Sequence, residues 1–438
     1  MTRKERAARA IATRLREAGY TAYLAGGCVR DRLLGLEPKD FDVASNAAAG
    51  VVQRLFAKTI PVGVQFGVLI VVEDEQTVEV ATFRADDVYL DGRHPTAVRF
   101  SSAEEDARRR DITINGMFLD PQTDTIIDYV DGQTDLRRRI IRAIGDPAAR
   151  ISEDRLRMLR AVRFAARFGF AIEPATFAAI RAAAASIVDI AWERIGDEIA
   201  RMLTDATAGS ARHAFELLDQ SGLLEHVLPE VARLKGVLQS PDYHPEGDVW
   251  VHTLGLLQQL EQPSETLGLG ALLHDIAKPS TAHATDTRIT FYGHCELGAD
   301  MAVAICQRLR RSRDTWERVA YLVRDHLRLV QAPDMRLSTL KRFLAQDGID
   351  ELLQLARLDA LASNNDLTYH DFCRRKLEEL SREEIQPPPL LRGTDLLDLG
   401  LEPGPRFGEI LAAVSDAQLD GTLTTHAQAL AWVRQRFL

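Results

Sequence analysis

The sequence predicts a mixed α+β domain at the N-terminus, followed by a chain that is helical throughout. Residues 1–145 contain several short apolar runs bounded by turn residues, which is the pattern of β-strands. From Ser152 onward the apolar residues recur with helical spacing instead. The length of 438 residues exceeds one ordinary hydrophobic core, so we expect about two to four domains.

The N-terminal domain begins with an amphipathic helix over residues 1–20 and a short strand at 23–25. That strand ends at Gly26–Gly27, and a second helix is expected over 28–36. A β-hairpin follows, because two apolar runs flank the polar turn Asp74–Glu75. The two runs of the hairpin and two shorter strands are expected at 68–72, 78–82, 126–129 and 140–144.

Composition divides the helical half of the chain. Ser152–Asp154 supplies a cap and an acidic first turn, and the alanine-rich stretch 175–185 favours helix. Loop-type residues after position 240 indicate a boundary, and the three prolines after Gln386 indicate a linker, because proline cannot continue a helix. The predicted domains are residues 1–145, 146–240, 241–365 and 366–438.

Composition places the chain among folded, water-soluble proteins, because 46% of its residues are hydrophobic and 27% are charged. No apolar run reaches the roughly 20 residues needed to cross a bilayer, and the N-terminal helix lacks the features of a signal peptide. The four cysteines form no Cys-x-x-Cys pair, which fits a reducing compartment. We therefore expect a cytoplasmic protein without membrane contact.

The net charge of −10 argues against a nucleic-acid partner, but the distribution of arginine partly reverses that argument. Arginines cluster at 108–110, 137–139 and 155–167, all in the N-terminal part of the chain. A local basic surface for RNA can therefore exist on an acidic protein. Each cluster taken alone is also compatible with the solvated face of a helix.

The segment from Gly26 to Asp42 combines a glycine turn with two carboxylates. A glycine pair between a strand and a helix lets backbone N–H groups approach a phosphate, and Arg30 lies one turn into that helix. Asp40 and Asp42 alternate along an extended segment, so both carboxylates face the same side.

Glu79 supplies a third carboxylate, because Val78 and Val80 flank it as core-facing residues of the neighbouring hairpin. Hard oxygen ligands of this kind select Mg²⁺. Three carboxylates around two such ions can activate an attacking hydroxyl and stabilise a leaving pyrophosphate. The alternative is an exposed strand edge beside a tight turn.

Residues 26–45, GGCVRDRLLGLEPKDFDVAS, resemble the signature of the class II branch of the tRNA nucleotidyltransferase and bacterial poly(A) polymerase superfamily. Further motifs follow in that family's order, and the resemblance covers essentially the whole chain. It implies a polymerase-β-like nucleotidyltransferase head followed by an all-α neck, body and HD-containing tail. The further motifs are Arg109-Arg110-Asp111 with Asn115, Asp131-Gly132 with Asp135-Leu136, residues 153–157, Glu193-Arg194-Ile195 and residues 399–405.

The resemblance also implies an activity, which is addition of CMP and AMP from CTP and ATP to the 3′ end of tRNA. The 3′-hydroxyl attacks the α-phosphate and pyrophosphate leaves. Asp40, Asp42 and Glu79 are the expected catalytic residues, with Asp40 and Asp42 holding Mg²⁺. The residues expected to bind the nucleotide are Gly26, Gly27, Arg30, Arg110, Asp111, Asp154, Arg157, Arg160 and Arg163.

Asp154, Arg157, Arg160 and Arg163 recur every three residues, and the first three share one stripe of a helix. A carboxylate and a guanidinium one turn apart suit the amino donor and ring-nitrogen acceptor that cytosine and adenine share. Guanine and uracil offer the opposite order and would leave both groups mispaired, at a cost of ~1–3 kcal/mol per group. The helix pattern alone favours an Asp154–Arg157 ion pair, whereas the family resemblance favours the base-reading role.

Two segments bear on the product of the reaction. Residues 84–100 resemble the flexible loop of CCA-adding and A-adding members, which members that stop after CC lack. Residues 61–68 contain none of the basic residues that poly(A) polymerases usually carry at the equivalent stretch. Full CCA addition and addition of the terminal A alone both stay open, and a bacterial poly(A) polymerase is the alternative.

Histidines recur through residues 245–365, and His274–Asp275 ends an apolar run that predicts a buried pair. Such a pair needs a metal or a hydrogen-bond network. The pattern resembles the HD-domain metal-dependent phosphohydrolases, which implies a second divalent metal, whether Ni²⁺, Co²⁺, Mn²⁺ or Mg²⁺. The matched ligands are His252, His274, Asp275 and Asp359, while His294 and His326 match additional histidines of some members.

Two roles stay open for this histidine-rich region, and two alternatives stay open for the whole protein. The region can act as a phosphohydrolase beside an active head, or serve only as an RNA-binding body. The protein can also be an HD phosphohydrolase with an inactive head, or a non-catalytic RNA-binding protein. The sequence predicts no oligomeric state.

Overall fold

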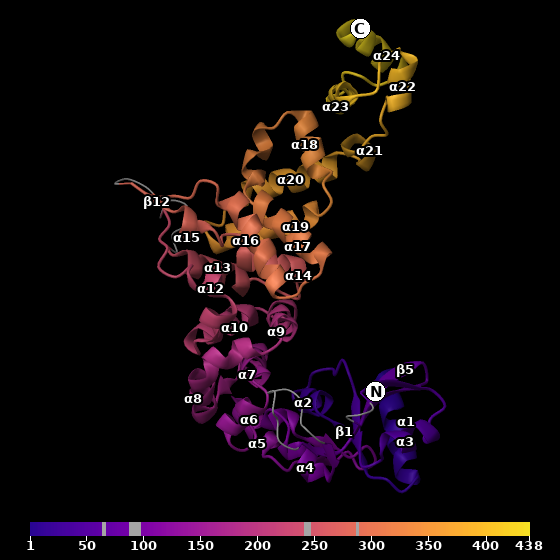
Figure 1. The fold of residues 1–438 in the computed structure, drawn as a ribbon, viewed down its shortest axis with the longest axis vertical. Helices are drawn as coiled ribbons and strands as arrows, with labels where there is room; N and C mark the ends of the chain where they lie inside the picture. Colours follow the sequence, from indigo (N-terminus) through magenta and orange to yellow (C-terminus); the bar gives the residue numbers. More distant parts are fainter. Residues whose placement is uncertain (64–66, 87–97, 241–246, 286–288) are drawn as a thin grey trace. The chain divides into compact units, whose positions relative to one another are not determined.

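The computed structural model describes residues 1–63, 67–86, 98–240, 247–285 and 289–438, drawn as a ribbon in Figure 1. The chain divides into two compact units, Met1–Pro229 and Glu230–Leu438. Most of the loop predicted at 84–100, and the centre of the stretch 61–68, lie outside the described residues. The short strands β6 (Arg84–Asp86) and β7 (Val98–Phe100) pair antiparallel beside the undescribed part of that loop.

The first unit is built on a seven-stranded mixed sheet with the order β3-β4-β5-β2-β1-β8-β9. Only the β2–β5 pair is parallel, because the chain crosses over from the hairpin to the sheet centre. The predicted hairpin is confirmed, with Asp74 and Glu75 in its turn at φ 47° and 62°. The strands are β1 (Ala22–Ala25), β2 (Asp42–Ser45), β3 (Thr59–Gly63), β4 (Val68–Glu73), β5 (Gln76–Thr82), β8 (Phe118–Leu119) and β9 (Ile126–Ile127).

The N-terminal helix α1 (Arg3–Glu17), predicted over 1–20, packs against β1, β2 and β5. Its apolar residues recur at helical spacing and are fully buried. Strand β1 ends at Ala25, and Gly26 turns the chain with φ 72° into α2 (Gly27–Leu33). The predicted strand–glycine turn–helix unit is therefore present.

Among the described residues, the first unit is otherwise mostly helical, with a two-residue parallel pair between β10 (Ile140–Ile141) and β11 (Ala171–Ile172) in addition to the β6–β7 pair. The sequence pattern gave no sign of β11. It forms because the preceding helix ends at Gly169, whose φ of 64° turns the chain back alongside β10. The helices are α3 (Ala49–Leu55), α4 (Ala103–Arg108), α5 (Gly132–Arg138), α6 (Pro147–Glu153), α7 (Leu156–Phe168), α8 (Pro174–Ala183), α9 (Trp192–Thr204), α10 (Ser210–Gln220) and α11 (Leu223–Val227).

The prediction that a helix starts at Ser152–Asp154 is wrong. Those residues end α6, and Asp154 itself is extended, with φ −147° and ψ 103°. The Asp154 carboxylate accepts the backbone N–H of Leu156 at 3.1 Å, so its side chain stabilises the start of α7 from outside the helix. The apolar stripe predicted for this helix is confirmed, since Leu159 and Val162 are fully buried.

Where the structure describes it, the second unit is almost entirely helical, and a short antiparallel pair joins β12 (His283–Ala284) to β13 (Ile289–Thr290). Helix α14 (Glu265–Leu273) is buried from Leu267 to its end, as its continuous apolar run predicts. The other helices used below are α13 (Val249–Gln258), α15 (Lys278–Thr281), α16 (His294–Arg308), α17 (Arg313–Asp325) and α19 (Ile349–Ala362).

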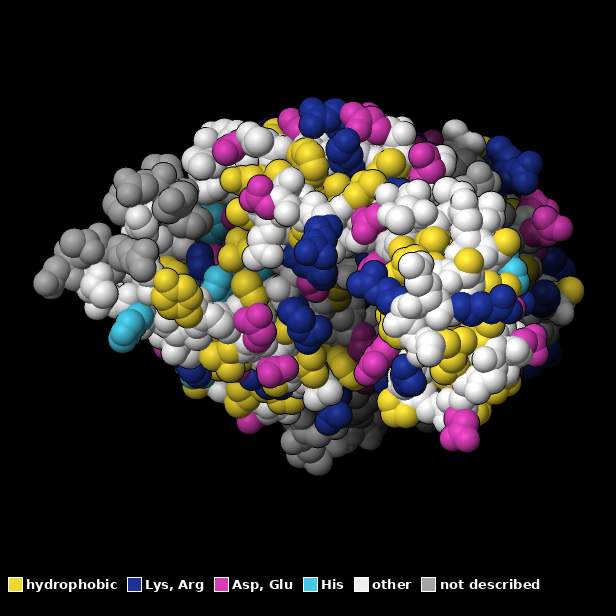
Figure 2. Space-filling view, turned by 90° about the horizontal axis from the view of Figure 1, so that it is seen from above, with side chains coloured by type: hydrophobic (Ala, Val, Ile, Leu, Met, Phe, Trp, Pro, Cys, Tyr) yellow, Lys and Arg dark blue, Asp and Glu magenta, His cyan; other side chains and the backbone are white. Residues whose placement is uncertain are grey.

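The C-terminal helices form a separate apolar cluster that includes Leu396, Ile410 and Val433. The prolines after Gln386 lie between α21 (Arg382–Ile385) and α22 (Gly393–Asp398), so the predicted linker is confirmed as non-helical. On the face of the molecule shown in Figure 2, basic and acidic side chains are interspersed. Among the described residues, no helix combines the length and apolar character needed to span a bilayer. The remaining helices are α12 (Pro229–Ala232), α18 (Leu337–Leu344), α20 (Thr368–Glu379), α23 (Pro405–Leu419) and α24 (His426–Phe437).

Candidate active site and metal centre

The first unit contains a cavity of about 740 Å³. Its walls come from the β1–α2 turn, the segment that leads into β2, and the helices α7 and α9. Eleven basic side chains and six aspartates line it, although the whole chain carries a net charge of −10. This local excess of positive charge suits a polyanionic ligand.

The two aspartates predicted to hold metal both line this cavity. Asp42 is the first residue of β2, whereas Asp40 precedes the strand and forms an ion pair with Lys4. Glu79 lies in β5, the strand paired in parallel with β2. Desolvation, together with repulsion from Glu79 and Asp40, raises the pKa of Asp42 to about 6. Carboxylates crowded in this way fit a cation between them.

At the glycine turn in the cavity wall, both the backbone conformation and the nearby Arg110 side chain favour a residue without a Cβ atom. Gly26 has a positive φ, and a Cβ there would lie 3.2 Å from Nη1 of Arg110. Arg30 is only 4% exposed and donates to Asp31 and Asn115, each at 2.6 Å. Arg30 therefore supports the wall of the cavity through protein partners, while Gly27 beside it lines the same cavity.

Arg110 and Asp111 also line the cavity. Arg110 donates to Asp106 at 3.0 Å and lies over the ring of Phe118. Asp111 accepts two hydrogen bonds from Arg160, at 2.7 and 2.6 Å. Burial opposes ionisation of Asp111, but the charge of Arg160 outweighs it and lowers the pKa of Asp111 to about 2. This pair ties α7 to the segment that carries Asp111.

The predicted Asp154–Arg157 pair is not formed. Arg194 of α9 donates to both oxygens of Asp154, at 3.1 and 2.7 Å. Arg157 instead contacts Glu153 at 2.6 Å and donates to the backbone carbonyl of Arg109 at 3.0 Å. The reason is the break before α7, which leaves Asp154 outside the helix on which Arg157 sits. Both side chains nevertheless line the cavity.

Arg163 points to a different environment from Arg157 and Arg160. It is 5% exposed and pairs with the buried Glu198 at 2.6 Å. Each step of three residues turns a helix by about 60°, so Arg163 has rotated off the stripe that begins the helix. Its guanidinium also lies 4.2 Å from the centre of the Phe164 ring, at the edge of the cavity.

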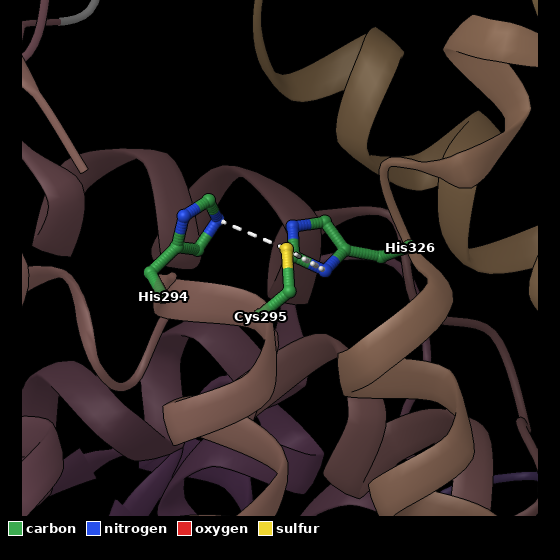
Figure 3. A group of neighbouring side chains, drawn as sticks. All are labelled: His294, Cys295 and His326. Carbon is green, nitrogen blue, oxygen red and sulfur yellow. Dashed lines mark hydrogen bonds between the residues drawn. The ribbon is translucent and has the colours of Figure 1, made fainter. Parts of the chain in front are cut away.

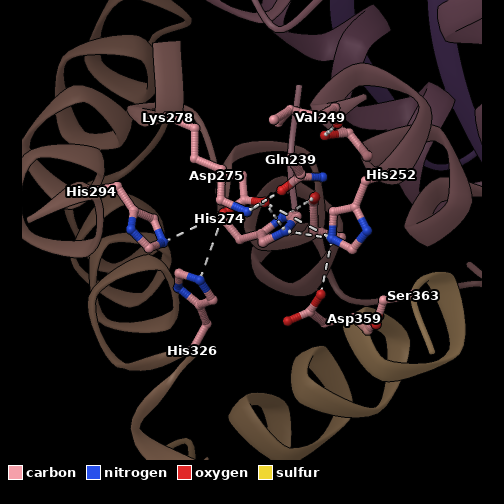
Figure 4. Close-up of polar contacts among 12 residues, drawn as sticks. Gln239, Val249, His252, His274, Asp275, Lys278, His294, His326, Asp359 and Ser363 are labelled. Atoms are coloured by element: carbon pink, nitrogen blue, oxygen red, sulfur yellow. Dashed lines mark hydrogen bonds and ion pairs between the residues drawn. The ribbon is translucent and has the colours of Figure 1, made fainter. Parts of the chain in front are cut away.

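The histidines of the second unit converge on one buried centre, which Figure 4 shows with His252 and Asp359 on one side of His274–Asp275. His252 Nε2 lies 2.9 Å from Asp359 Oδ1 and 3.3 Å from His274 Nε2. His274 Nε2 lies 3.1 Å from Asp275 Oδ2. His274 Nδ1 is 3.0 Å from the Ala271 carbonyl, which fixes Nδ1 as the protonated nitrogen and leaves Nε2 to face the others. This donor set fits a divalent metal.

Lys278 and Gln239 complete this side of the centre. The Lys278 ammonium lies 2.7 Å from Asp275 Oδ2 and donates to Gln239 Oε1 at 2.5 Å. Burial disfavours an ionised Asp275, but the charges of His274 and Lys278 outweigh it and hold the pKa of Asp275 well below its ordinary value. Asp275 is therefore ionised and available to a metal at neutral pH.

On the other side of His274–Asp275 lie His294 and His326 in Figure 4, and Figure 3 draws these two residues together with Cys295. One ligand atom from each of the three lies within 4.8 Å of the others. Burial lowers the pKa of His326 to about 4 and raises the pKa of the Cys295 thiol to about 12. Neutral imidazole is the form of histidine that binds metals.

Sequence reasoning missed several of these partners. The sequence indicated Arg194 only as part of a motif, without its contact with Asp154. The contact of Lys278 could have been predicted, because Lys278 lies three residues, about one helical turn, after Asp275. Cys295 adjoins His294 but was not considered as a ligand. Gln239 has no signal in the sequence, because its contact with Lys278 spans 39 positions of the chain.

Comparison with known proteins gives three matches to family models along the chain. Residues 22–142 match the poly A polymerase head domain, and residues 169–235 match a probable RNA and SrmB-binding site of polymerase A. Residues 248–364 match the HD domain.

Full-length proteins are similar as well. An A-adding tRNA nucleotidyltransferase of Deinococcus radiodurans is 34% identical, over 94% of this chain and 95% of that one. A CCA-adding enzyme of Limosilactobacillus fermentum is 44% identical over a shorter stretch, 45% of this chain and 49% of that one. The crystal structure of the Bacillus stearothermophilus CCA-adding enzyme in complex with CTP is 27% identical, with a TM-score of 0.67 over 100% of this chain and 98% of that one.

Proposed function

The chain belongs to the tRNA nucleotidyltransferase family of CCA-adding and A-adding enzymes, and we propose that it adds CMP and AMP from CTP and ATP to the 3′ end of tRNA without a template. One observation carries the proposal. A basic cavity of about 740 Å³, which is room for a nucleotide, is lined by the two aspartates expected to bind metal and also by Asp154, Arg157 and Arg160. A poly(A) polymerase is not favoured, since the full-length relatives named above are tRNA enzymes.

Asp40 and Asp42 hold Mg²⁺ in this proposal, with Glu79 as the third carboxylate. The crowding that raises the pKa of Asp42 supports it, because a cation relieves that repulsion. Bound Mg²⁺ would promote attack of the 3′-hydroxyl on the α-phosphate and stabilise the pyrophosphate that leaves. The turn at Gly26–Gly27 and Arg110 bind the triphosphate, while Arg30 and Arg160 keep the cavity wall in shape through their buried partners.

Asp154 and Arg157 read the base. The carboxylate accepts the amino group of cytosine or adenine, and the guanidinium donates to the adjacent ring nitrogen. Arg157 must release Glu153 to do so, whereas Asp154 can accept the base while Arg194 holds it, because a carboxylate has four lone-pair sites. Asp111 and Arg163 complete the nucleotide-binding set through their pairs with Arg160 and Glu198.

A single assay tests the activity and identifies the product. The protein is incubated with tRNA transcripts that lack CCA, lack the terminal A, or are complete, with CTP and ATP singly and together. CCA addition extends the first transcript with both nucleotides, A addition extends only the second, and a poly(A) polymerase gives a long ladder with ATP alone on all three. Absence of extension on every transcript contradicts the proposal.

The HD centre gives a second candidate function, metal-dependent phosphoester hydrolysis. The convergence of His252, His274, Asp275 and Asp359 favours it. One ligand atom from each of the first three lies within 4.8 Å of the others, and His252 Nε2 lies 2.9 Å from Asp359 Oδ1. A Ni²⁺, Co²⁺, Mn²⁺ or Mg²⁺ ion held there would activate a water molecule. Release of phosphate from a terminal phosphate of RNA, or opening of a 2′,3′-cyclic phosphate to a monoester, dependent on one of these ions, is the measurement.

We also propose the bounds of the four domains and the cellular location. We assign residues 1–145 to the head, 146–240 to the neck, 241–365 to the HD domain and 366–438 to the tail. We also place the enzyme in the cytoplasm, where tRNA, ATP and CTP are found. Fractionation of cells that express the tagged protein tests the location.

A further inference from the structure

Asp106 of α4 is a buried carboxylate that holds two arginines of the cavity wall at once. Its side chain is 2% exposed. Its Oδ1 atom accepts hydrogen bonds from Arg109 at 3.0 and 2.6 Å, and its Oδ2 atom accepts from Arg110 at 3.2 and 3.0 Å. Arg109 and Arg110 follow Asp106 by three and four residues, the spacing that brings side chains to one face of a helical turn. Both arginines line the cavity.

The guanidinium of Arg110 is held from three directions. Besides its two bonds to Asp106, Nη1 of Arg110 donates to the carbonyl of Asn115 at 3.1 Å, and the group lies 5.0 Å from the centre of the Phe118 ring. A guanidinium has five N–H groups, so these bonds leave two of them for a ligand among the contacts that the structure describes. Nη1 is also the atom 3.2 Å from the position of a Cβ at Gly26. Arg110 therefore meets the glycine turn with a fixed orientation.

The helix that carries Asp106 is itself firmly placed. A capping box between Ser102 and Glu105 satisfies the backbone at the start of α4. On the buried side of the helix, Ala107 packs in one apolar cluster with Phe118, the residue under the Arg110 guanidinium. A side chain fixed in this way can hold another in one orientation.

An ionised Asp106 has two opposite effects on an anionic ligand. Burial disfavours the ionised carboxylate, but the charges of Arg110 and Arg109 outweigh it and hold the pKa of Asp106 below its ordinary value. The negative charge of Asp106 repels an anion in the cavity, whereas its hydrogen bonds orient Arg110 toward one. The two effects predict opposite results when the charge is removed.

We propose that Asp106 is a positioning residue for the triphosphate, which holds Arg110 with its remaining N–H groups directed at the phosphates beside Gly26. The inference rests on the triphosphate-binding role proposed above for Arg110. It requires the fork of a guanidinium, because one edge of Arg110 bonds to Asp106 while other N–H groups stay available to the ligand.

The test measures binding of inorganic tripolyphosphate, which carries no base, to the full-length protein in the presence of Mg²⁺ by titration calorimetry. In Asp106→Asn the amide places an N–H group against a guanidinium, so one arginine loses its acceptor. We expect the dissociation constant to rise by about 10- to 100-fold. Removal of a repelling charge alone would lower it. Glu104→Gln is the matched control, because Glu104 pairs with Arg108 on the exposed side of the same helix, and it is expected to bind like the wild type.

A double-mutant cycle shows whether Asp106 acts through Arg110. Arg110→Lys keeps the charge but lacks the fork, so it is expected to weaken binding to a similar degree. Addition of Asp106→Asn to Arg110→Lys is expected to change the dissociation constant by less than about twofold, because the two residues act as one unit. The number of sites per chain in each titration reports the folded fraction. Partial unfolding lowers that number and leaves the dissociation constant of the remaining sites unaltered.

Three results overturn the inference: unchanged or tighter binding in Asp106→Asn, wild-type affinity in Arg110→Lys, or full multiplication of the two losses in the double variant. The tRNA extension assay decides the proposed function separately. A wild-type protein that shows the expected affinities but extends no tRNA contradicts the proposed activity alone. A wild-type protein that extends tRNA, with wild-type affinity in Asp106→Asn, contradicts this inference alone.

Discussion

Arg194 holds Asp154 through two hydrogen bonds, one to each carboxylate oxygen, at 3.1 and 2.7 Å. The two residues lie 40 positions apart in the chain. Asp154 occupies the extended turn between α6 and α7, and Arg194 lies in the first turns of α9. The orientation of the proposed base-reading carboxylate thus depends on α9, a helix that lines the cavity but carries neither the proposed metal ligands nor Arg157.

Replacement of Arg194 by alanine is expected to weaken selection of the base. Asp154 loses a charge-assisted bidentate partner worth about 1–3 kcal/mol, and its carboxylate is then held less firmly, by the backbone N–H of Leu156. We expect kcat/KM for CTP and ATP to fall by about 10- to 100-fold, with a rise in the fraction of UTP incorporated. Arg212→Ala is the control, because Arg212 forms a partly exposed ion pair with Glu216 in the same unit. Unaltered selectivity in Arg194→Ala would rule out the positioning role.

The double substitution of Asp154 and Arg157 by alanine is expected to relax selection against UTP and GTP. Each mispaired group costs the wrong base about 1–3 kcal/mol, and that penalty disappears when neither group is present. Single-nucleotide incorporation on a tRNA transcript that lacks CCA measures the effect with each of the four nucleotides. If the double variant still rejects UTP and GTP as strongly as the wild type, Asp154 and Arg157 do not read the base.

Asp40→Ala is expected to abolish nucleotide incorporation and leave the fold intact. The Asp40 side chain is 73% exposed and forms an ion pair with the partly exposed Lys4. Loss of an exposed ion pair changes stability by no more than about 1 kcal/mol. Incorporation assays and urea unfolding on the same preparation separate the two effects. Lys4→Ala serves as the control, since it removes the same ion pair and keeps the carboxylate. Residual incorporation at the wild-type rate would exclude Asp40 from metal binding.

Asp42→Asn is expected to stabilise the metal-free protein at neutral pH. Desolvation and nearby carboxylates raise the pKa of Asp42 to about 6, so the folded protein holds more protons than the unfolded chain between about pH 4 and pH 6. Stability from this group is therefore lost as the pH rises through that window. Because Asp42 opens to the cavity, solvent screening reduces the effect to about 1 kcal/mol.

Urea unfolding in a chelator at about pH 4.5 and about pH 7.5 tests this, with Asn substituted for Asp42. The substituted protein should gain stability over the wild type at the higher pH and show little difference at the lower. Addition of Mg²⁺ at the higher pH should stabilise the wild type only, because the amide is a weaker ligand than a carboxylate. A gain of the same size at both pH values would contradict the assignment.

The sequence predicted the elements that local patterns specify. The glycine turn at Gly26, the hairpin around Asp74–Glu75 and the buried apolar stripe of α7 all follow from residue spacing alone. The break at Asp154 could not be predicted from spacing, because the side chain of Asp154 is held by Leu156 on one side and by Arg194, from another helix, on the other. Packing determines which distant residues form ion pairs, and the helical spacing of residues gives no information about that packing.

The two proposed metal sites also differ in how far apart their ligands lie in the sequence. The carboxylates Asp40 and Asp42 are close in the sequence, so their proximity was predictable. The HD centre instead gathers residues from α13, α14, α16 and α19, and a recognised motif was needed to name them. The position of Cys295 could be predicted neither from closeness in the sequence to the ligands nor from a recognised motif. Only the packing of α16 against α17, which carries the histidine pair to Asp275, brings its thiol to the centre.

Asp359→Asn is expected to weaken metal binding in the HD centre and leave nucleotide addition unchanged. The Asp359 carboxylate lies 2.9 Å from His252 Nε2. Burial disfavours the ionised carboxylate, but the hydrogen bond from His252 outweighs that effect and lowers the pKa of Asp359 below its ordinary value. An amide in its place is a poorer ligand, and we expect about a 10- to 100-fold loss of affinity for Co²⁺ or Mn²⁺ in equilibrium dialysis. Asp300→Asn is the matched control, because Asp300 is an exposed aspartate of α16 in the same unit. Equal metal affinity in both variants would remove Asp359 from the ligand set, and a parallel loss of CCA or A addition would show that the two activities share one site.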